Sequence, residues 1–170
     1  KEAGANISEI SVASVGEAMG LTGLLYSPEA YATWKHKIEE SPDLMFAKIL
    51  ERFRSGANVL ASDFINAWDK LMDLRKQYHS EVEAYDAVLI PTSPIIPPEI
   101  NRLMNDGDFY NSQNLLALRN TRIGNLMGSC SITLPTDIPS CGFLIMGRPN
   151  EEERLLRLAQ ACELVLASNR

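Results

Sequence analysis

A chain of 170 residues with 45% hydrophobic and 22% charged residues is long enough and apolar enough to build one domain with its own core. This composition excludes collagen-like, low-complexity and disordered chains, because there is ample apolar side chain to offset the ordering entropy. Acidic residues outnumber basic ones by 22 to 16, and the net charge of -6 argues against direct binding to nucleic-acid phosphates.

The first half of the chain carries mainly helical patterns. Two Ser-Pro-acidic sequences, which begin at Ser27 and Ser41, are typical helix starts, because serine can cap the first turn and proline suits it. We therefore expect helices over about 28–39 and 43–54. Gly56 is expected to mark a break between helices.

One long helix is expected next, over about 58–83, because apolar residues recur there at helical spacing. We interpret Trp68 and Tyr78 in this helix as core residues. His79 lies near the end of the helix, where a histidine complements the negative charge of a helix terminus, so capping is its simplest role.

Three short segments of the second half have the composition of strands. Ala87–Ile90 is apolar and closed by Pro91, as is typical of a buried strand that runs into an irregular loop. Ser131–Leu134 and Phe143–Met146 flank a turn rich in proline, which predicts a hairpin. We expect a loop over 99–112, because this segment is rich in Asn, Asp and Gly.

Two further helices complete the expected elements. Apolar residues between Leu115 and Met127 predict one of them before the hairpin. Asn150 is expected to cap the last helix, whose positive end holds Glu151–Glu153, and we interpret this acidic triple as a helix start and not as a metal site.

The predicted fold class is α/β, with about three strands of a larger mixed sheet flanked by helices. Residues 1–84 are mainly helical and residues 85–170 combine strands with helices, in a single unit that spans 1–170. A buried strand needs cover on both faces and neighbours on both sides. We therefore expect part of the sheet to lie outside this chain.

The cysteines and the apolar stretches bear on localisation. Cys130, Cys141 and Cys162 are an odd and sparse set, which suits a reducing compartment better than a disulfide framework and matches no zinc motif. No apolar stretch approaches the length of a membrane span, and no signal-peptide pattern is present at the start. We expect a cytoplasmic protein.

Gly128–Ser131 is the one stretch with the setting of a nucleophile. Cys130 would act as a thiolate if His79 lay beside it, whereas a small cysteine packed at a tight turn is the commoner arrangement. The sequence contains no His-x-x-x-His pair, no glycine-rich phosphate loop and no Gly-x-Ser-x-Gly elbow.

An ordered set of short features covers residues 119–163. They are Thr121, Asn125 and Gly128, then the strand closed by Pro135, then Gly147-Arg148, then the acidic helix start. In this order and spacing they resemble the C-terminal end of amidase-signature enzymes. Tyr85–Pro94, Pro28–Tyr31 and Arg52–Gly56 are similar to upstream segments of that family, so the resemblance covers about 25–165.

The resemblance implies an amide hydrolase with a Ser-Ser-Lys triad. In that family one serine attacks the carbonyl, a second serine relays the proton, and a neutral, desolvated lysine is the base. These groups lie in the family's N-terminal half, and this chain has no Gly-Gly-Ser-Ser-like run. We therefore assign no catalytic residue, expect the C-terminal portion of an amidase that is inactive alone, and expect neither a metal nor an organic cofactor.

Three substrate-binding positions are implied by the same resemblance. Ile90 and Cys130 fall where some family members contact substrate, although the family often has proline at the position of Cys130, and plain packing is the alternative. Arg52 falls where tRNA-dependent amidotransferase A subunits bind the glutamine carboxylate, and a solvated helix charge is its alternative. Those subunits also use an acidic residue where this chain has Leu118, which disfavours that function.

Three functions remain open besides that of a self-contained hydrolase with Cys130 as its nucleophile. The first is the C-terminal portion of an amidase that hydrolyses a carboxamide to a carboxylic acid and ammonia or an amine. The second is the A subunit of a glutamine-dependent tRNA amidotransferase, and the third is a non-catalytic binding or scaffold domain. The expected partners are the missing N-terminal half and a small-molecule amide, with a homodimer as a further option and no membrane or direct nucleic-acid partner.

Overall fold

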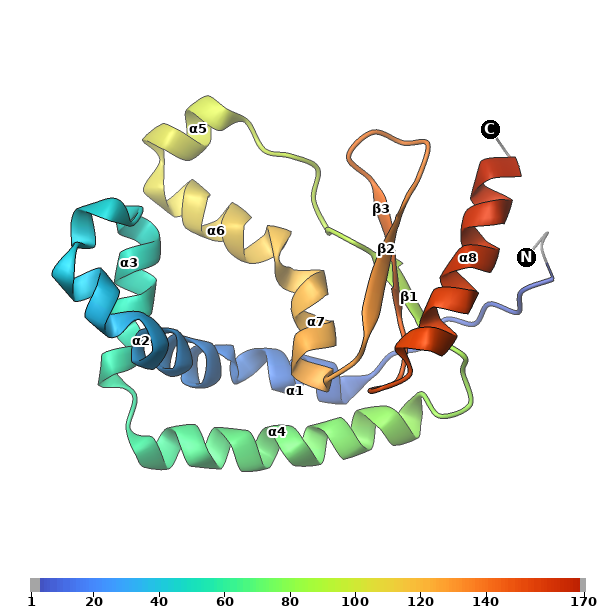
Figure 1. The fold of residues 1–170 in the computed structure, drawn as a ribbon, viewed down its shortest axis with the longest axis horizontal. Coiled ribbons are helices and arrows are strands. Elements are labelled where there is room, and N and C mark those ends of the chain that lie inside the picture. Colours follow the sequence, from blue (N-terminus) through green and yellow to red (C-terminus); the bar gives the residue numbers. More distant parts are fainter. Residues whose placement is uncertain (1–3, 169–170) are drawn as a thin grey trace. The chain divides into compact units, whose positions relative to one another are not determined.

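The computed structural model describes residues 4–168, and the chain divides into two compact units (Figure 1). The helical unit comprises Ala13–Gln77. The sheet unit comprises the segment up to Val12 and the chain from Tyr78 onward. No helix in the described residues is long and apolar enough to cross a membrane.

The helical unit contains short and long helices in succession. They are α1 (Ala13–Gly20), α2 (Thr22–Glu40), the 3-10 turn η1 (Pro42–Leu44), α3 (Ala47–Arg54), the 3-10 turn η2 (Ser55–Asn58) and most of α4 (Ala61–Glu81). The long helix expected over 58–83 is confirmed by α4. Its buried residues Ala67, Leu71 and Leu74 recur at helical spacing, as an amphipathic helix requires.

The predicted helix start at Ser27 is wrong. Helix α2 begins at Thr22 and Pro28 lies inside it. Proline removes one donor from a helix, and the Ser27 hydroxyl forms an additional bond in this turn, to the Gly23 carbonyl at 2.7 Å. The helix expected over 43–54 is divided into η1 and α3.

Gly56 lies at a break between helices, as expected. A glycine is required there because η2 packs closely against α2. Helix α3 ends at Arg54, and Gly56 lies in η2, buried directly against α2. A Cβ atom at Gly56 would lie 2.0 Å from the Ser27 carbonyl oxygen, so no other residue fits without a backbone shift. The glycine is therefore required by close backbone approach and not by a positive φ angle.

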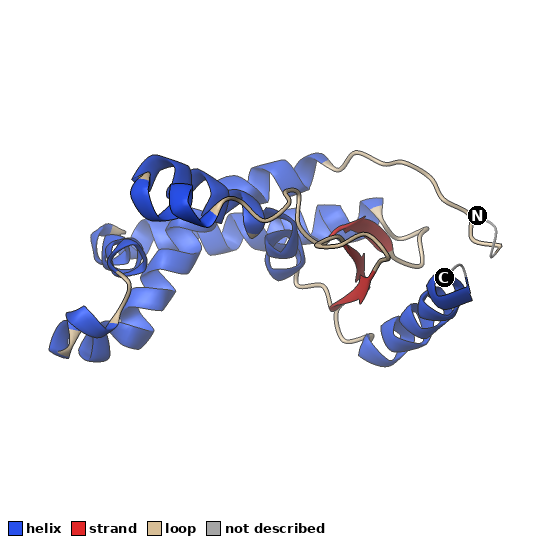
Figure 2. Ribbon diagram, turned by 90° about the horizontal axis from the view of Figure 1, so that it is seen from above, coloured by secondary structure: helices blue, strands red, loops and turns tan. Residues whose placement is uncertain are grey.

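Within the described residues, the sheet has three strands in the order β1-β3-β2. Figure 1 labels these strands and Figure 2 draws them in red. They are β1 (Val88–Pro91), β2 (Ser131–Pro135) and β3 (Gly142–Met146). Both β1 and β2 run antiparallel to β3, with Ile90 opposite Leu144 and Ile132 opposite Ile145. The predicted strands and the β2–β3 hairpin are confirmed.

Helices cover both faces of the central strand. Helix α8 (Glu152–Ser168) packs on one face, where Leu134, Ile145, Leu155 and Ala159 form a buried cluster. Met146 points to the opposite face, because successive side chains of a strand alternate. Gly124 of α7 (Arg119–Met127) lies near Met146 on that face.

The loop expected over 99–112 is wrong, because two helices occupy this segment. They are α5 (Ile100–Asn105) and α6 (Gly107–Ala117). The Asp106 carboxylate accepts a hydrogen bond from the Phe109 N–H at 2.9 Å and so caps α6. Asn and Asp favour helix caps as well as loops, which is why composition alone misassigned the segment.

The last helix begins later than expected. The first bond of α8 runs from the Leu155 N–H to the Glu151 carbonyl at 3.0 Å, so Glu151 is the residue that flanks the helix. Asn150 precedes it in a left-handed turn with φ of 62° and does not cap the helix. Glu152 and Glu153 fill the first turn, as predicted.

Candidate functional site

Ile90, the first predicted substrate-binding residue, lies near the end of β1. It is half-buried and lies opposite Leu144 of the central strand. The chain leaves the strand at Pro91 and continues through Thr92 into the irregular segment before α5. The structure therefore places Ile90 at a strand end, as the resemblance implied.

Several polar groups hold this strand end in place. The Asn120 side-chain amide donates to the Pro91 carbonyl at 2.7 Å, and Asn120 is only 8% exposed. The Thr92 N–H donates to the Gly142 carbonyl at 2.9 Å, and the Thr92 and Thr133 hydroxyls bond at 3.3 Å. These contacts fix where the residues after Ile90 go.

The residues that hold the strand end were missed by the sequence analysis. Asn120 and Pro91 are 29 positions apart, and no short motif links them. The same is true of Gly142, where a Cβ atom would lie 2.6 Å from the Thr92 hydroxyl oxygen. Only the folded arrangement reveals that these positions act together.

Cys130, the second predicted residue, is bonded to the backbone and packed. Its thiol donates to the Arg148 carbonyl at 3.0 Å, and its own carbonyl accepts from the Gly147 N–H at 2.8 Å. The half-buried side chain also packs against the buried cluster under α8. These contacts are those of a packed cysteine, which is the alternative to substrate contact given above for Cys130.

Ile90 and Cys130 are separated within the sheet. The central strand β3 lies between β1 and β2. Cys130 is level with Gly147, whereas Ile90 is level with Leu144, three positions along β3. The structure therefore does not bring these two residues into one contact.

His79 is engaged with a backbone carbonyl and not with a thiol. Its Nε2 atom lies 3.0 Å from the Met127 carbonyl oxygen, so this nitrogen carries the proton in that bond. Met127 is the last residue of α7, and the expected capping role of His79 is therefore seen at the end of a different helix. With both side chains committed to carbonyls, the arrangement gives no support to a Cys130–His79 nucleophile.

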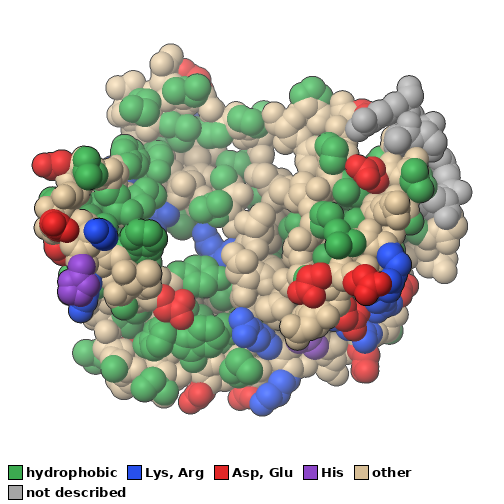
Figure 3. All heavy atoms as spheres, viewed as in Figure 1, with side chains coloured by type: hydrophobic (Ala, Val, Ile, Leu, Met, Phe, Trp, Pro, Cys, Tyr) green, Lys and Arg blue, Asp and Glu red, His purple; other side chains and the backbone are tan. Residues whose placement is uncertain are grey.

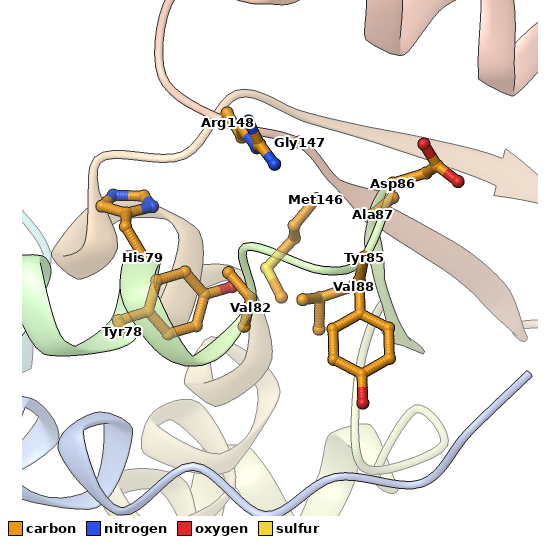
Figure 4. A pocket seen from close by; sticks show the side chains of 10 residues that line it. All are labelled: Tyr78, His79, Val82, Tyr85, Asp86, Ala87, Val88, Met146, Gly147 and Arg148. Atoms are coloured by element: carbon orange, nitrogen blue, oxygen red, sulfur yellow. The ribbon is translucent and has the colours of Figure 1, made fainter.

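A small cavity lies beside the end of α4, between β1 and the end of β3 (Figure 4). Its volume is about 10 Å³, which is roughly the space that one water molecule needs. The cavity is lined by Tyr78, His79, Val82, Tyr85, Asp86, Ala87, Val88, Met146, Gly147 and Arg148. Burial raises the pKa of Tyr78, and a hydrogen bond with Ser129 lowers it in part. The cavity is too small for an amide substrate.

Two arginines join the start of β1 to the segment that enters α8. Arg148 donates to the Glu83 carbonyl at 2.6 Å. Arg154 bonds both Glu151, at 3.1 Å, and Asp86, and hydrogen bonding to Glu151 raises the pKa of Arg154. These bonds are structural links within the sheet unit.

Arg52, the third predicted residue, belongs to the helical unit. It lies half-buried in α3, and its carbonyl accepts from the Ser55 hydroxyl at 2.7 Å. An open groove beside α3 is lined by Glu51 and Arg54 and does not include Arg52. Arg54 is held by Glu39 through two bonds of 2.9 and 2.6 Å.

Neither a metal cluster nor a catalytic constellation emerges from residues 4–168. Among them, no three His, Cys, Asp or Glu side chains are arranged to hold a metal ion.

No family model matches the chain, but individual proteins do. A 2-amino-5-chloromuconic acid deaminase from Comamonas testosteroni is 37% identical over 87 residues, which are 48% of this chain and 18% of that protein. An amidase from Pseudomonas putida is 26% identical over 168 residues, 96% of this chain and 36% of that protein. The A subunit of the glutamyl-tRNA(Gln) amidotransferase from Desulforamulus reducens is 28% identical over 189 residues, 95% of this chain and 38% of that protein.

Solved structures share the fold over nearly the whole chain. A 6-aminohexanoate cyclic dimer hydrolase, solved with its substrate, has a TM-score of 0.78 at 21% identity, over 96% of this chain and 38% of that chain. A crystal structure of an amidase has a TM-score of 0.72 at 19% identity, over 95% of this chain and 38% of that chain.

The resemblance to the amidase-signature family and the predicted α/β fold class are confirmed by these comparisons. The chain is homologous to amidases and to amidotransferase A subunits. It matches only 18 to 38% of the length of these curated relatives.

Proposed function

We propose that this chain is the C-terminal portion of an amidase that hydrolyses a carboxamide to a carboxylic acid and ammonia or an amine. The observation that carries the proposal is the similarity to an amidase over 96% of this chain but only 36% of that protein. The Ser-Ser-Lys triad implied by the resemblance would lie in the part of the enzyme outside this chain.

The chemistry follows from the implied triad. One serine oxygen attacks the amide carbonyl, and the second serine passes the proton to the neutral lysine. Backbone N–H groups stabilise the negative oxygen of the tetrahedral intermediate. The leaving nitrogen takes a proton and departs, and water then hydrolyses the acyl-serine to the carboxylic acid.

Within this enzyme the sheet unit would supply part of the wall of the substrate site. Ile90 is a proposed substrate contact at a strand end that hydrogen bonds from Asn120 and Thr92 hold in place. Cys130 remains a predicted contact, although its bond to the Arg148 carbonyl favours packing. Arg52 remains a predicted contact for a carboxylate, which belongs to the amidotransferase alternative.

The test is ammonia release from simple carboxamides by the longer polypeptide that contains residues 1–170. The proposal expects hydrolysis that a serine-directed inhibitor abolishes, and no hydrolysis by residues 1–170 alone. A longer polypeptide that lacks a lysine and a Gly-Gly-Ser-Ser-like run would contradict it. That outcome would leave a non-catalytic binding or scaffold domain.

The second candidate is the A subunit of a glutamine-dependent amidotransferase. The 28% identity to such a protein over 95% of this chain favours it. Leu118 argues against it, because those proteins use an acidic residue at this position. Glutamine hydrolysis that appears only after partner subunits are added would support the amidotransferase, whereas hydrolysis by the single polypeptide would support the amidase.

The cellular setting is part of the same proposal. Cys130, Cys141 and Cys162 are free thiols in the structure, which supports a reducing, cytoplasmic location. The proposed partners are the rest of the enzyme and a small-molecule amide. Homodimer formation stays a prediction.

A further inference from the structure

The charged residues of the sheet unit are unevenly distributed along the chain. The segments 87–98, 109–136 and 138–147 contain no aspartate, glutamate, lysine or histidine. They comprise β1 and the loop after it, most of α6, and all of α7, β2 and β3. Their only charged side chains are the two arginines Arg119 and Arg122, so these segments carry a net charge of +2 in a chain whose net charge is -6.

These weakly charged segments meet at the end of β1. The Asn120 side-chain amide donates to the Pro91 carbonyl at 2.7 Å, and the Thr92 N–H joins the same strand end to β3. Asn120 lies between Arg119 and Arg122 in α7. The bond to Pro91 therefore holds the helical turn that carries both arginines beside the strand end.

Neither of these two guanidinium groups has a partner among residues 4–168. Within that range they form no hydrogen bond, no ion pair and no ring contact. Residues three positions apart are neighbours on a helix surface, so the charges of Arg119 and Arg122 repel each other. Arg122 is also half-buried, and arginine does not lose its proton to escape burial. An anion bound between them would remove both penalties.

The arginines of α8, by contrast, are accompanied by carboxylates. Arg154 pairs with Glu151 at 3.1 Å, and Arg157 pairs with Glu153. Figure 3 shows acidic side chains in red and basic side chains in blue close together near the start of this helix. The lack of a carboxylate beside the arginines of α7 is therefore a local property of the segments around the end of β1.

We propose that Arg119 and Arg122 receive a carboxylate of the substrate, so that the hydrolysed molecule is a carboxamide that also carries a carboxylate. This inference rests on the proposed function, in which the strand end with Ile90 forms part of the substrate wall, and it adds the substrate class. The planar guanidinium presents paired donors that match the two oxygens of a carboxylate. A wall with positive charge and no acidic group attracts anionic substrates and disfavours cationic ones.

Two matched pairs of amides test the substrate class in the longer polypeptide that contains residues 1–170. Succinamic acid and glutaramic acid carry a carboxylate, whereas butanamide and pentanamide have similar sizes and no charge. We expect kcat/KM to be at least about 10-fold higher for the acids, since hydrogen bonds to charged groups are the stronger ones. Equal values, or higher values for the neutral amides, overturn the proposal.

Three variants that each remove one positive charge locate the carboxylate. We expect Arg119→Gln and Arg122→Gln to raise KM for the acidic amides by about 10-fold or more and to leave the neutral amides unchanged. Arg157→Gln removes the same charge from the exposed surface of α8 and should leave KM for both kinds of amide unchanged. If Arg119→Gln and Arg122→Gln instead weaken folding and lower activity on all amides alike, the arginines pair with a carboxylate of the enzyme itself. That result overturns the proposal.

Titration calorimetry with succinate and glutarate separates this inference from the proposed function, because binding needs no hydrolysis. Dicarboxylate binding that Arg119→Gln and Arg122→Gln abolish, in a polypeptide that hydrolyses no amide, overturns the proposed function and leaves the carboxylate site standing. Hydrolysis of the neutral amides without binding of either dicarboxylate does the reverse. The absence of both binding and hydrolysis overturns both.

Discussion

The side-chain amide of Asn120 donates to the carbonyl of Pro91 at 2.7 Å and thereby joins the first turn of α7 to the end of β1. Asn120 is buried, and proline at the end of an edge strand has no donor of its own to offer. The bond fixes the strand end that carries Ile90. It also occupies a backbone carbonyl of β1, the edge strand on the other side of β3 from β2.

Asn120→Asp tests this bond with little change in size. A carboxylate cannot donate to the Pro91 carbonyl, so we expect unfolding free energy to fall by about 1–3 kcal/mol, the cost of an unsatisfied buried polar group. Urea unfolding measures the change. Asn101→Ala, on the exposed surface of α5, is the control and should change stability by less than about 0.5 kcal/mol. Equal effects of the two variants would contradict the assigned role.

Gly56→Ala tests the close approach of η2 to α2. The new Cβ atom would meet the Ser27 carbonyl oxygen at 2.0 Å, so we expect a loss of about 2–3 kcal/mol or more. Gly16→Ala in α1 is the matched control, because no atom lies within 4 Å of its new Cβ. The control should gain about 0.5–1 kcal/mol from reduced chain entropy. Thermal or urea unfolding should show a loss of stability for Gly56→Ala and a gain for Gly16→Ala.

Asp106→Ala tests the cap of α6. The variant loses the carboxylate that accepts from the Phe109 N–H, and we expect a loss of about 1 kcal/mol. Asp108→Ala removes an acidic residue in the first turn of the same helix without removing the cap, and it should cost only a few tenths of a kcal/mol. If Asp108→Ala were the more damaging variant, the cap would not be what fixes the start of α6.

The Glu39–Arg54 pair predicts a pH dependence of stability. Hydrogen bonding to Arg54 holds the pKa of Glu39 below its ordinary value of 4.5. A lowered folded-state pKa means that the contribution is present above pH 4.5 and is lost as the pH falls through the folded-state value. Urea unfolding from pH 7 to 3 should therefore show a smaller acid-induced loss in Glu39→Gln. Identical pH profiles would show that the exposed pair contributes nothing measurable.

Thiol labelling tests whether Cys130 is a reactive nucleophile. Cys141 is exposed, whereas the Cys130 thiol is half-buried and donates to the Arg148 carbonyl. We expect a thiol-specific reagent to modify Cys141 first and Cys130 much more slowly, as followed by peptide mass spectrometry. Preferential modification of Cys130 would indicate an activated thiolate and would revive the cysteine-hydrolase alternative.

The sequence predicted the elements whose signals are local. The long helix α4 and the three strands follow from apolar periodicity and from short β-rich runs, and the structure contains them. Signals that were ambiguous failed. Aspartate is common both in loops and at helix caps. The sequence around Asp106 therefore predicted a loop, whereas the structure has α5 and α6 there.

Contacts between distant residues could not be predicted at all. Pro28 is tolerated inside α2 in a turn that Gly56 packs against, and Asn120 acquires its role from Pro91, 29 positions away. The candidate site shows the same limit. Ile90 and Cys130 were chosen by resemblance to a family, and only the strand order shows that β3 separates them.

The most direct test of the account is ammonia release from a panel of carboxamides by the longer polypeptide and by residues 1–170 alone. The account predicts that the longer polypeptide releases ammonia in a reaction that a serine-directed inhibitor stops, and that residues 1–170 release none. Ammonia release by residues 1–170 at a rate insensitive to that inhibitor would contradict it.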